Sequence, residues 1–155
     1  MTARQQNRDF VRVGCSRIAG TGVFAKREIP RGTRIIEYTG KRLPPAQVLI
    51  DINEGKRTSV YIFRLNETTV IDGASGGNEA RFINHSCAPN CEANMFDNNM
   101  YIYAMADIAC GDELTFDYQL SPALNGATSK KEGLSCHCGA PDCRGTMLSQ
   151  KLKTA

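Results

Sequence analysis

Three short segments concentrate side chains that could bind a ligand or take part in catalysis. Residues 81–91 bring together arginine, asparagine, histidine, serine and cysteine side chains, residues 19–25 form a glycine turn leading into a strand, and residues 111–118 form a turn leading into an aromatic strand. Amide and imidazole groups can hydrogen-bond a polar ligand, and a glycine turn lets the backbone approach it closely. Each segment taken alone also fits an ordinary polar turn or hairpin, so their combination carries the argument.

The cysteines favour metal binding over a disulfide framework. There are seven of them, an odd number, and Cys136, Cys138 and Cys143 crowd together near the end of the chain instead of spreading along it. Three thiolates cannot complete a tetrahedral zinc site, so a fourth ligand must come from elsewhere in the chain.

Short β-strands must position most of these groups. Alternation and β-branched or aromatic runs predict strands over residues 10–16, 23–25, 35–38, 60–65, 68–71, 92–96, 100–106 and 113–118. Residues 66–67 and 97–99 read as hairpin turns. Pro44 and Pro45, followed by an apolar stripe, predict one helix that continues to about residue 55. We therefore expect a mostly β protein.

The composition is that of an ordinary globular domain. With 155 residues, 41% hydrophobic and 23% charged, the chain is long enough for one sizeable core and is not wholly disordered. Its net charge of +3 is too small to imply nucleic-acid binding. It contains no apolar run of membrane-spanning length and no secretory leader, so we expect an intracellular protein.

The chain divides into five expected segments. These are an extended or disordered N-terminus over residues 1–9, a β domain over 10–119, a flexible linker over 120–133, a cysteine segment over 134–150 and a polar tail over 151–155.

The segments named above, in their order, resemble the signature of SET-domain protein lysine methyltransferases. The glycine turn at 19–25, the Asn-His-Ser-Cys stretch at 84–87 and the Glu-Leu-Thr-Phe-Asp-Tyr stretch at 113–118 match its motifs. Residues 36–40 and 61–64 match as well, and the final Cys-x-Cys-Gly-x3-Cys-Arg-Gly looks like a post-SET zinc segment. The resemblance covers about residues 10–148, nearly the whole chain.

The resemblance implies a fold of several small β-sheets with a knot-like crossing between the Asn84 segment and the Tyr118 strand, plus a C-terminal zinc-binding segment. It also implies a site for S-adenosylmethionine, the methyl donor. Carried over position by position, the cofactor-binding residues would be Ala19, Gly20, Thr21, Tyr61, Arg81, Asn84, His85 and His137. His85 is not assigned as a base, because a single histidine more often serves a structural hydrogen bond.

The same resemblance assigns catalytic positions. Tyr118 would orient the substrate amine, Tyr61 and Tyr38 would line the lysine channel, and Phe116, two residues before Tyr118, would leave room for di- or trimethylation. Deprotonating lysine at pH 7 costs roughly 4 to 5 kcal/mol. A sulfonium about 4 Å away offsets roughly 4 kcal/mol of this at an effective dielectric of about 20, and an apolar channel acts in the same direction. The tyrosines also fit half-buried strand positions, and Phe116 also fits a core position.

For the metal, the family supplies the fourth ligand from the Asn-His-Ser-Cys motif, here Cys87. One structural zinc ion would then be held by Cys87, Cys136, Cys138 and Cys143. Cys91 is the rival for the fourth position and His137 is conceivable, while Cys91 also reads, with Cys15 and Cys110, as a small buried apolar residue.

The sequence leaves four functions open. The leading one is a monomeric protein lysine methyltransferase acting on a histone tail, in the nucleus or on chromosomes if the source is eukaryotic or the protein is a host-directed effector, and in the cytoplasm if it is bacterial. The others are a non-histone methyltransferase or catalytically silent SET-fold binding module, and a zinc protein that contacts nucleic acid through Arg144, Lys151 and Lys153, which would bind less tightly as salt rises.

Overall fold

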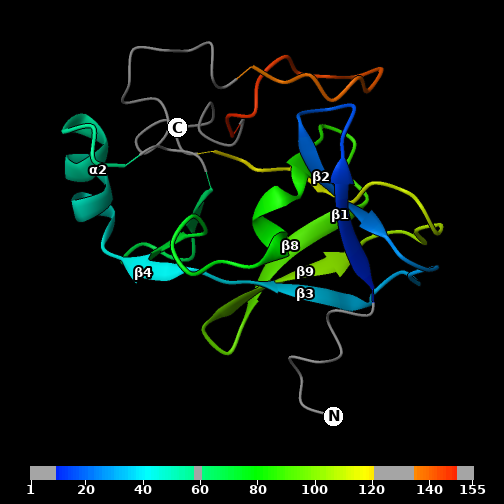
Figure 1. Cartoon of the computed structure of the whole chain (residues 1–155), viewed down its shortest axis with the longest axis horizontal. Coiled ribbons are helices and arrows are strands. Elements are labelled where there is room, and N and C mark those ends of the chain that lie inside the picture. Colours follow the sequence, from blue (N-terminus) through cyan, green and yellow to red (C-terminus); the bar gives the residue numbers. More distant parts are fainter. Residues whose placement is uncertain (1–9, 58–60, 121–134, 150–155) are drawn as a thin grey trace.

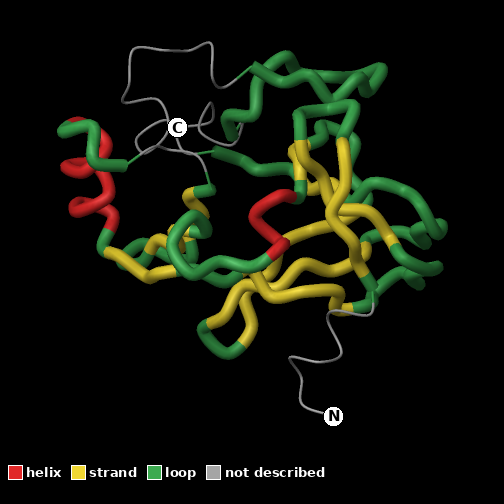
Figure 2. Tube along the Cα trace, in the orientation of Figure 1, coloured by secondary structure: helices red, strands yellow, loops and turns green. Residues whose placement is uncertain are grey.

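The computed structural model describes residues 10–57, 61–120 and 135–149 (Figure 1). Strands far outnumber helices among these residues (Figure 2), which confirms the mostly β prediction. The predicted N-terminus at 1–9, most of the predicted linker and the predicted tail lie outside the described residues. Among those that are described, no helix has the length and apolar character needed to cross a membrane.

The strands form three sheets. One sheet pairs β1 with β2, a second has the order β3-β9-β8-β10-β7, and a third has the order β4-β6-β5. The strand bounds are β1 Val11–Cys15, β2 Thr21–Ala25, β3 Arg34–Tyr38, β4 Lys41–Leu43, β5 Ile62–Arg64, β6 Val70–Asp72, β7 Asn84–His85, β8 Cys91–Phe96, β9 Asn99–Ala104 and β10 Thr115–Phe116. The predicted hairpins are present as the antiparallel pairs β5 with β6 and β8 with β9.

Local chemistry explains the β8–β9 hairpin. Asp97 and Asn98 both have positive φ, 48° and 63°, which is what a two-residue turn with the right twist for a hairpin requires. Along β9 the side chains of Met100, Ile102 and Ala104 are buried, while the alternate positions are half-buried. This period of two directs one face of the sheet into the core.

Helix α2 (Pro45–Asn53) begins where the proline pair predicts. Pro44 is the extended N-cap residue and Pro45 occupies the first helical turn, where its missing N–H costs nothing. Val48 and Ile52 are buried and join Ile62 and Val70 in a small second core. A short 3-10 helix, η2 (Glu79–Phe82), precedes β7 and was not predicted.

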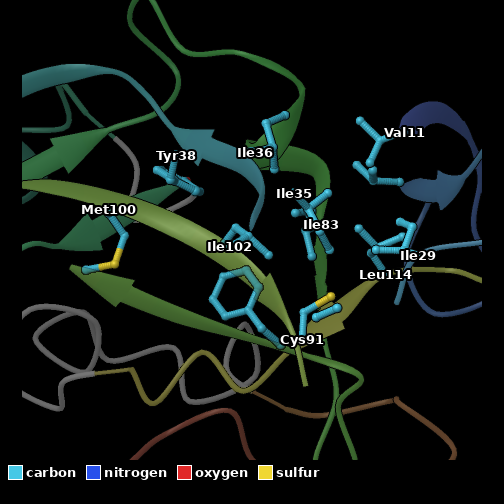
Figure 3. Packing of buried hydrophobic residues seen from close by; sticks show 14 of the residues in the cluster. Val11, Ile29, Ile35, Ile36, Tyr38, Ile83, Cys91, Met100, Ile102 and Leu114 are labelled. Carbon is cyan, nitrogen blue, oxygen red and sulfur yellow. The ribbon is translucent and has the colours of Figure 1, made fainter. Parts of the chain in front are cut away.

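The main core is formed by side chains from all three sheets and from η2. Figure 3 shows Ile35, Ile83 and Ile102 gathered between the strands, and these three side chains are at most 1% exposed. Leu114 and Cys91 are also fully buried there. Each such side chain contributes roughly 1.5 to 3 kcal/mol through burial, so this cluster holds the sheets in place around the site.

Strand β10 passes between two strands that are close together in the sequence. It pairs in parallel with β7 on one side and with β8 on the other. The loop joining β7 to β8 closes over it: Ser86 N donates to Phe116 O at 3.2 Å, Thr115 N donates to Asn90 Oδ1 at 2.9 Å, and the Asn90 amide donates to Glu113 O at 2.9 Å. This is the crossing that the resemblance implies.

The strand predicted over residues 113–118 is shorter in the structure. Only Thr115 and Phe116 are in the ladder, because the backbone N–H of Tyr118 donates to His85 Nδ1 at 3.0 Å instead of to a strand carbonyl, and Gln119 follows with a φ of 46°. The chain therefore turns away at Tyr118 and presents its ring beside η2 and β7.

Candidate active site and cysteine cluster

A cavity of about 1150 Å³ lies between the glycine turn, the third sheet, the crossing and the cysteine segment. Every residue predicted for catalysis or cofactor binding lines it, although these residues come from elements far apart in the sequence. They are Ala19, Gly20, Thr21, Tyr38, Tyr61, Arg81, Asn84, His85, Phe116, Tyr118 and His137. A cavity of this size is large enough for a nucleotide-sized ligand together with a side chain.

Asn84 ties the glycine turn to the crossing. Its amide nitrogen lies 3.0 Å from Thr21 O and 3.4 Å from Ala19 O. The turn is closed by a hydrogen bond from Ser16 N to Gly20 O at 2.8 Å, and Gly20 has a φ of 42°, a conformation that glycine adopts without strain. One side chain from β7 thus fixes the backbone of the glycine turn where it lines the cavity.

Four aromatic rings form a wall that also lines the cavity. The ring centroids of Tyr38 and Phe63 are 4.9 Å apart, those of Phe63 and Phe116 are 5.8 Å apart, and those of Phe116 and Tyr118 are 4.8 Å apart. Phe63 joins the two halves of this wall. Phe63 lies in the segment 61–64 that matches the family signature, but the sequence predicted no role for it.

The two phenol groups of this wall are hydrogen-bond donors to the backbone. Tyr118 Oη donates to Ile83 O, and Tyr38 Oη donates to Tyr61 O at 3.0 Å. Burial, followed by the neighbouring phenols, raises the pKa of Tyr118 and of Tyr38 well above the ordinary value. Both phenols therefore stay protonated at neutral pH, and neither serves as a strong base.

Tyr61 stands at the exposed side of the cavity, with 37% of its surface accessible. Its φ of 66° is unusual for a bulky residue. Its carbonyl accepts from both Tyr38 Oη and Gly73 N, and its ring meets Phe82 edge-on with centroids 5.9 Å apart. These contacts hold the strained backbone and aim the ring along the cavity wall.

His85 is a buried structural link. Its Nδ1 accepts from Tyr118 N at 3.0 Å, so the ring proton belongs on Nε2, which lies 3.5 Å from Cys87 Sγ. Burial first, and then the Arg144 cation, lower the pKa of His85 against the opposing effect of Asp117. A neutral imidazole thus connects the turn at Tyr118 to the thiol of Cys87.

Two further predicted residues have less direct positions. The Arg81 guanidinium lies 3.4 Å from Gly73 O and 3.5 Å from Gly77 O, and it stacks over the ring of Phe82. Arg81 therefore mainly stabilises the neighbouring loop at residues 73–77. His137 lines the cavity from the cysteine segment.

Four thiols converge beside the cavity. The sulfur atoms of Cys87, Cys136, Cys138 and Cys143 all lie within 4.8 Å of one another, and those of Cys87 and Cys136 are 3.7 Å apart. A tetrahedron with Zn–S bonds of about 2.3 Å has edges of about 3.8 Å, so this cluster could bind a zinc ion.

Of the three candidates for the fourth ligand, the structure places only Cys87 among the clustered thiols. Cys91 is 1% exposed within the main core, where burial raises the pKa of its thiol to about 12. Neither Cys91 nor His137 belongs to the cluster of convergent ligand atoms.

The cysteine segment is fastened to the crossing by an ion pair and by backbone bonds. Arg144 and Asp117 form a two-pronged contact of 2.7 and 3.0 Å. Leu120 N donates to Met147 O at 3.0 Å, and Ser149 N donates to Leu120 O at 2.9 Å. Arg144, the one described residue of the nucleic-acid hypothesis, is therefore paired within the protein, while Lys151 and Lys153 lie outside the described residues.

The fold and the site together define a class: a mostly β protein with a cavity at a strand crossing and a four-cysteine cluster beside it. The family model described as SET domain matches residues 20–119. The chain belongs to the SET domain family.

Curated relatives and solved structures agree. The chain is 36% identical over 147 residues to Histone-lysine N-methyltransferase trr of Drosophila melanogaster, covering 91% of this chain and 6% of that protein. It is 38% identical over 153 residues to Histone-lysine N-methyltransferase, H3 lysine-4 specific, of Schizosaccharomyces pombe, covering 94% of this chain and 15% of that protein. A humanized mutant of the Chaetomium thermophilum Polycomb Repressive Complex 2 bound to the inhibitor GSK126 superposes with a TM-score of 0.63 at 29% identity, over 70% of this chain and 14% of that one. The chain thus spans only a small part of these relatives.

Proposed function

We propose that this chain is a protein-lysine N-methyltransferase that transfers a methyl group from S-adenosylmethionine to a lysine of a histone tail. The observation that carries the proposal is the convergence of the glycine turn, Asn84, the aromatic wall and Tyr118 on one cavity. The names of the two curated relatives support the reaction and the histone substrate. A place in the nucleus or on chromosomes goes with that substrate.

The residues present suit the cofactor. Backbone groups of the turn at 19–21 and the amide of Asn84 offer hydrogen bonds to a polar ligand, while the aromatic rings offer apolar surface. When bound, S-adenosylmethionine supplies the methyl group and a positive charge on sulfur.

The chain's own residues prepare the attacking amine. The wall of Tyr38, Phe63 and Phe116 excludes water and disfavours an ammonium ion, which lowers the pKa of a lysine placed there. Tyr118, whose hydroxyl donates to Ile83 O, keeps its oxygen lone pairs free to orient the amine and the polarised methyl group. Phe116 carries no hydroxyl, so the wall leaves space for a second or third methyl group.

In this proposal zinc is structural. Cys87, Cys136, Cys138 and Cys143 would hold one ion with no open position, so the ion would fasten the cysteine segment over the cavity instead of activating a substrate.

Mass spectrometry of mixed histones incubated with zinc-loaded protein and isotopically labelled S-adenosylmethionine tests the proposal. Label on lysine is expected with the wild-type chain. Tyr118→Phe should lower the rate about 100-fold while retaining cofactor binding. Label at the same level in the variant would remove Tyr118 from the mechanism. Absence of lysine label with every histone, despite cofactor binding, would favour a non-histone substrate or a silent binding module.

A further inference from the structure

Glu113 does not line the cavity itself, but its side chain contacts Asn84, which does. It lies just before β10, against β2 and β7. Its Oε1 accepts from Ser16 Oγ at 2.7 Å and from Asn84 Nδ2 at 2.9 Å, although 97 and 29 positions separate it from these partners. A Cβ atom at Gly22 would lie 2.4 Å from the same oxygen, so the absence of a side chain there lets the carboxylate rest against β2.

Through these two partners Glu113 holds in place the glycine turn that lines the cavity. Ser16 Oγ gives its proton to Glu113 and accepts from Ile18 N at 3.0 Å, which fixes the start of the glycine turn. Asn84 directs its NH₂ group to Glu113 and Thr21 O. Among the described residues no partner engages the side-chain amide oxygen of Asn84, so this atom can accept a hydrogen bond from a ligand.

The charge of Glu113 is uncompensated by any ion pair within the described ranges. The charge also acts on groups in the cavity, because together with burial and Tyr61, which have larger effects, it raises the pKa of Tyr118. A fixed negative charge next to the glycine turn lowers the free energy of a cation in the cavity and has much less effect on a neutral ligand.

The methyl donor and its product differ in this respect. S-adenosylmethionine carries a sulfonium cation, and the thioether that remains after methyl transfer has lost that charge. We propose that Glu113 is a positioning residue that orients Ser16 and Asn84 and, by its carboxylate charge, favours binding of the cationic donor over the neutral product. This inference rests on the proposed function and adds product release to it.

Calorimetric titration of both ligands into matched variants separates charge from geometry. Glu113→Gln keeps an oxygen that can accept from Ser16 and Asn84 but removes the charge, so the Kd for the donor should rise roughly fivefold while the Kd for the thioether changes much less. Ser16→Ala keeps the charge and removes one link, so both Kd values should rise by a similar factor and their ratio should persist. Glu28→Gln, an exposed change outside the cavity, should alter neither constant.

An unchanged ratio of the two Kd values in Glu113→Gln would overturn the inference. If that variant does not fold, the wild-type chain still decides: an analogue with a protonated amine in place of the sulfonium should bind more tightly than the thioether, and equal or weaker binding would overturn it. Failure of the wild-type chain to bind donor and thioether alike would instead refute the proposed function.

Discussion

At the scale of single residues, Phe116 lies in the aromatic wall directly beside Tyr118. Its ring is 3% exposed and lies 4.8 Å from the Tyr118 ring, centroid to centroid. We predict that Phe116→Tyr shifts the product toward monomethyl-lysine, because a hydroxyl added at the ring edge would occupy space and hydrogen-bond the amine. The first methylation should change by about twofold or less. Intact-mass analysis of a peptide substrate over time measures both, and continued trimethylation at the wild-type rate would refute the role.

Tyr38 provides a pH-dependent contribution to stability whose sign follows from its raised pKa. The folded-state pKa lies above the unfolded value of about 10, so the contribution is fully present below pH 10 and is lost as pH rises through the folded-state pKa. Tyr38→Phe should therefore show a shallower loss of unfolding free energy above pH 10. At pH 7 it should cost about 1 kcal/mol, because the hydrogen bond to Tyr61 O is lost.

Urea unfolding between pH 7 and 11 measures the Tyr38 effect. Tyr101→Phe is the control, since Tyr101 is half-buried on β9 and does not line the cavity. Equal slopes above pH 10 for Tyr38→Phe and the wild-type chain would contradict the assignment.

At the scale of elements, local chemistry made some of the fold predictable. Asp97 and Asn98 specify the β8–β9 turn, and the proline pair specifies the start of α2. Strand β10 keeps only two residues of the strand predicted over 113–118, and the two-residue strand β7 was not predicted. Both pair as they do because the β7–β8 loop closes over the crossing. Such short strands depend on tertiary contacts that no local pattern encodes.

The candidate site shows the same division. The motif-bearing residues of the turn, of β7 and of β10 were predicted by resemblance, and the cavity brings them together. Ser16, Glu113 and Phe63 were missed because their roles arise from partners up to 97 positions away. The one sequence signal for Glu113 is a carboxylate placed just before the aromatic strand.

The Arg144–Asp117 pair joins two elements, and its effect should be local. It is partly exposed, so it contributes about 1 kcal/mol or less to global stability. We predict that Arg144→Gln leaves zinc content unchanged, raises hydrogen exchange over residues 135–149 and raises the KM for peptide several-fold. The reason is that the cysteine segment keeps its thiols but loses one attachment beside Tyr118.

Hydrogen-exchange mass spectrometry and peptide kinetics measure the loss of this attachment. Lys56→Gln removes an exposed ion pair with Glu54 far along the chain and should change neither readout. Loss of zinc in Arg144→Gln would show instead that the pair supports the metal cluster itself.

At the scale of the whole molecule, the sheets and the cysteine segment are stabilised differently. The main core cluster runs from Val11 to Phe116 and includes no residue of the cysteine segment. Many large side chains are fully buried in that cluster, whereas Cys138 and Cys143 are only partly buried. The sheets can therefore fold through apolar burial, whereas the cysteine segment is held by few apolar contacts and would gain most of its stability from a metal ion bound by its thiols.

Zinc removal should consequently separate activity from folding. Without the ion, the four thiols, which lie within 4.8 Å of one another, should no longer be held together. The segment over residues 135–149 should then leave the cavity, and the side lined by Cys136 and His137 should open to water. We predict about one zinc per chain, at least a 100-fold loss of methyl transfer on chelation, recovery on adding zinc, and a cooperative unfolding transition that persists without metal. Elemental analysis, kinetics and thermal denaturation test these points with Cys138→Ser and, as control, Cys110→Ser, whose thiol is exposed and outside the cluster. Full activity of the metal-free chain would contradict the prediction, and loss of all cooperative unfolding would show that zinc holds the sheets as well.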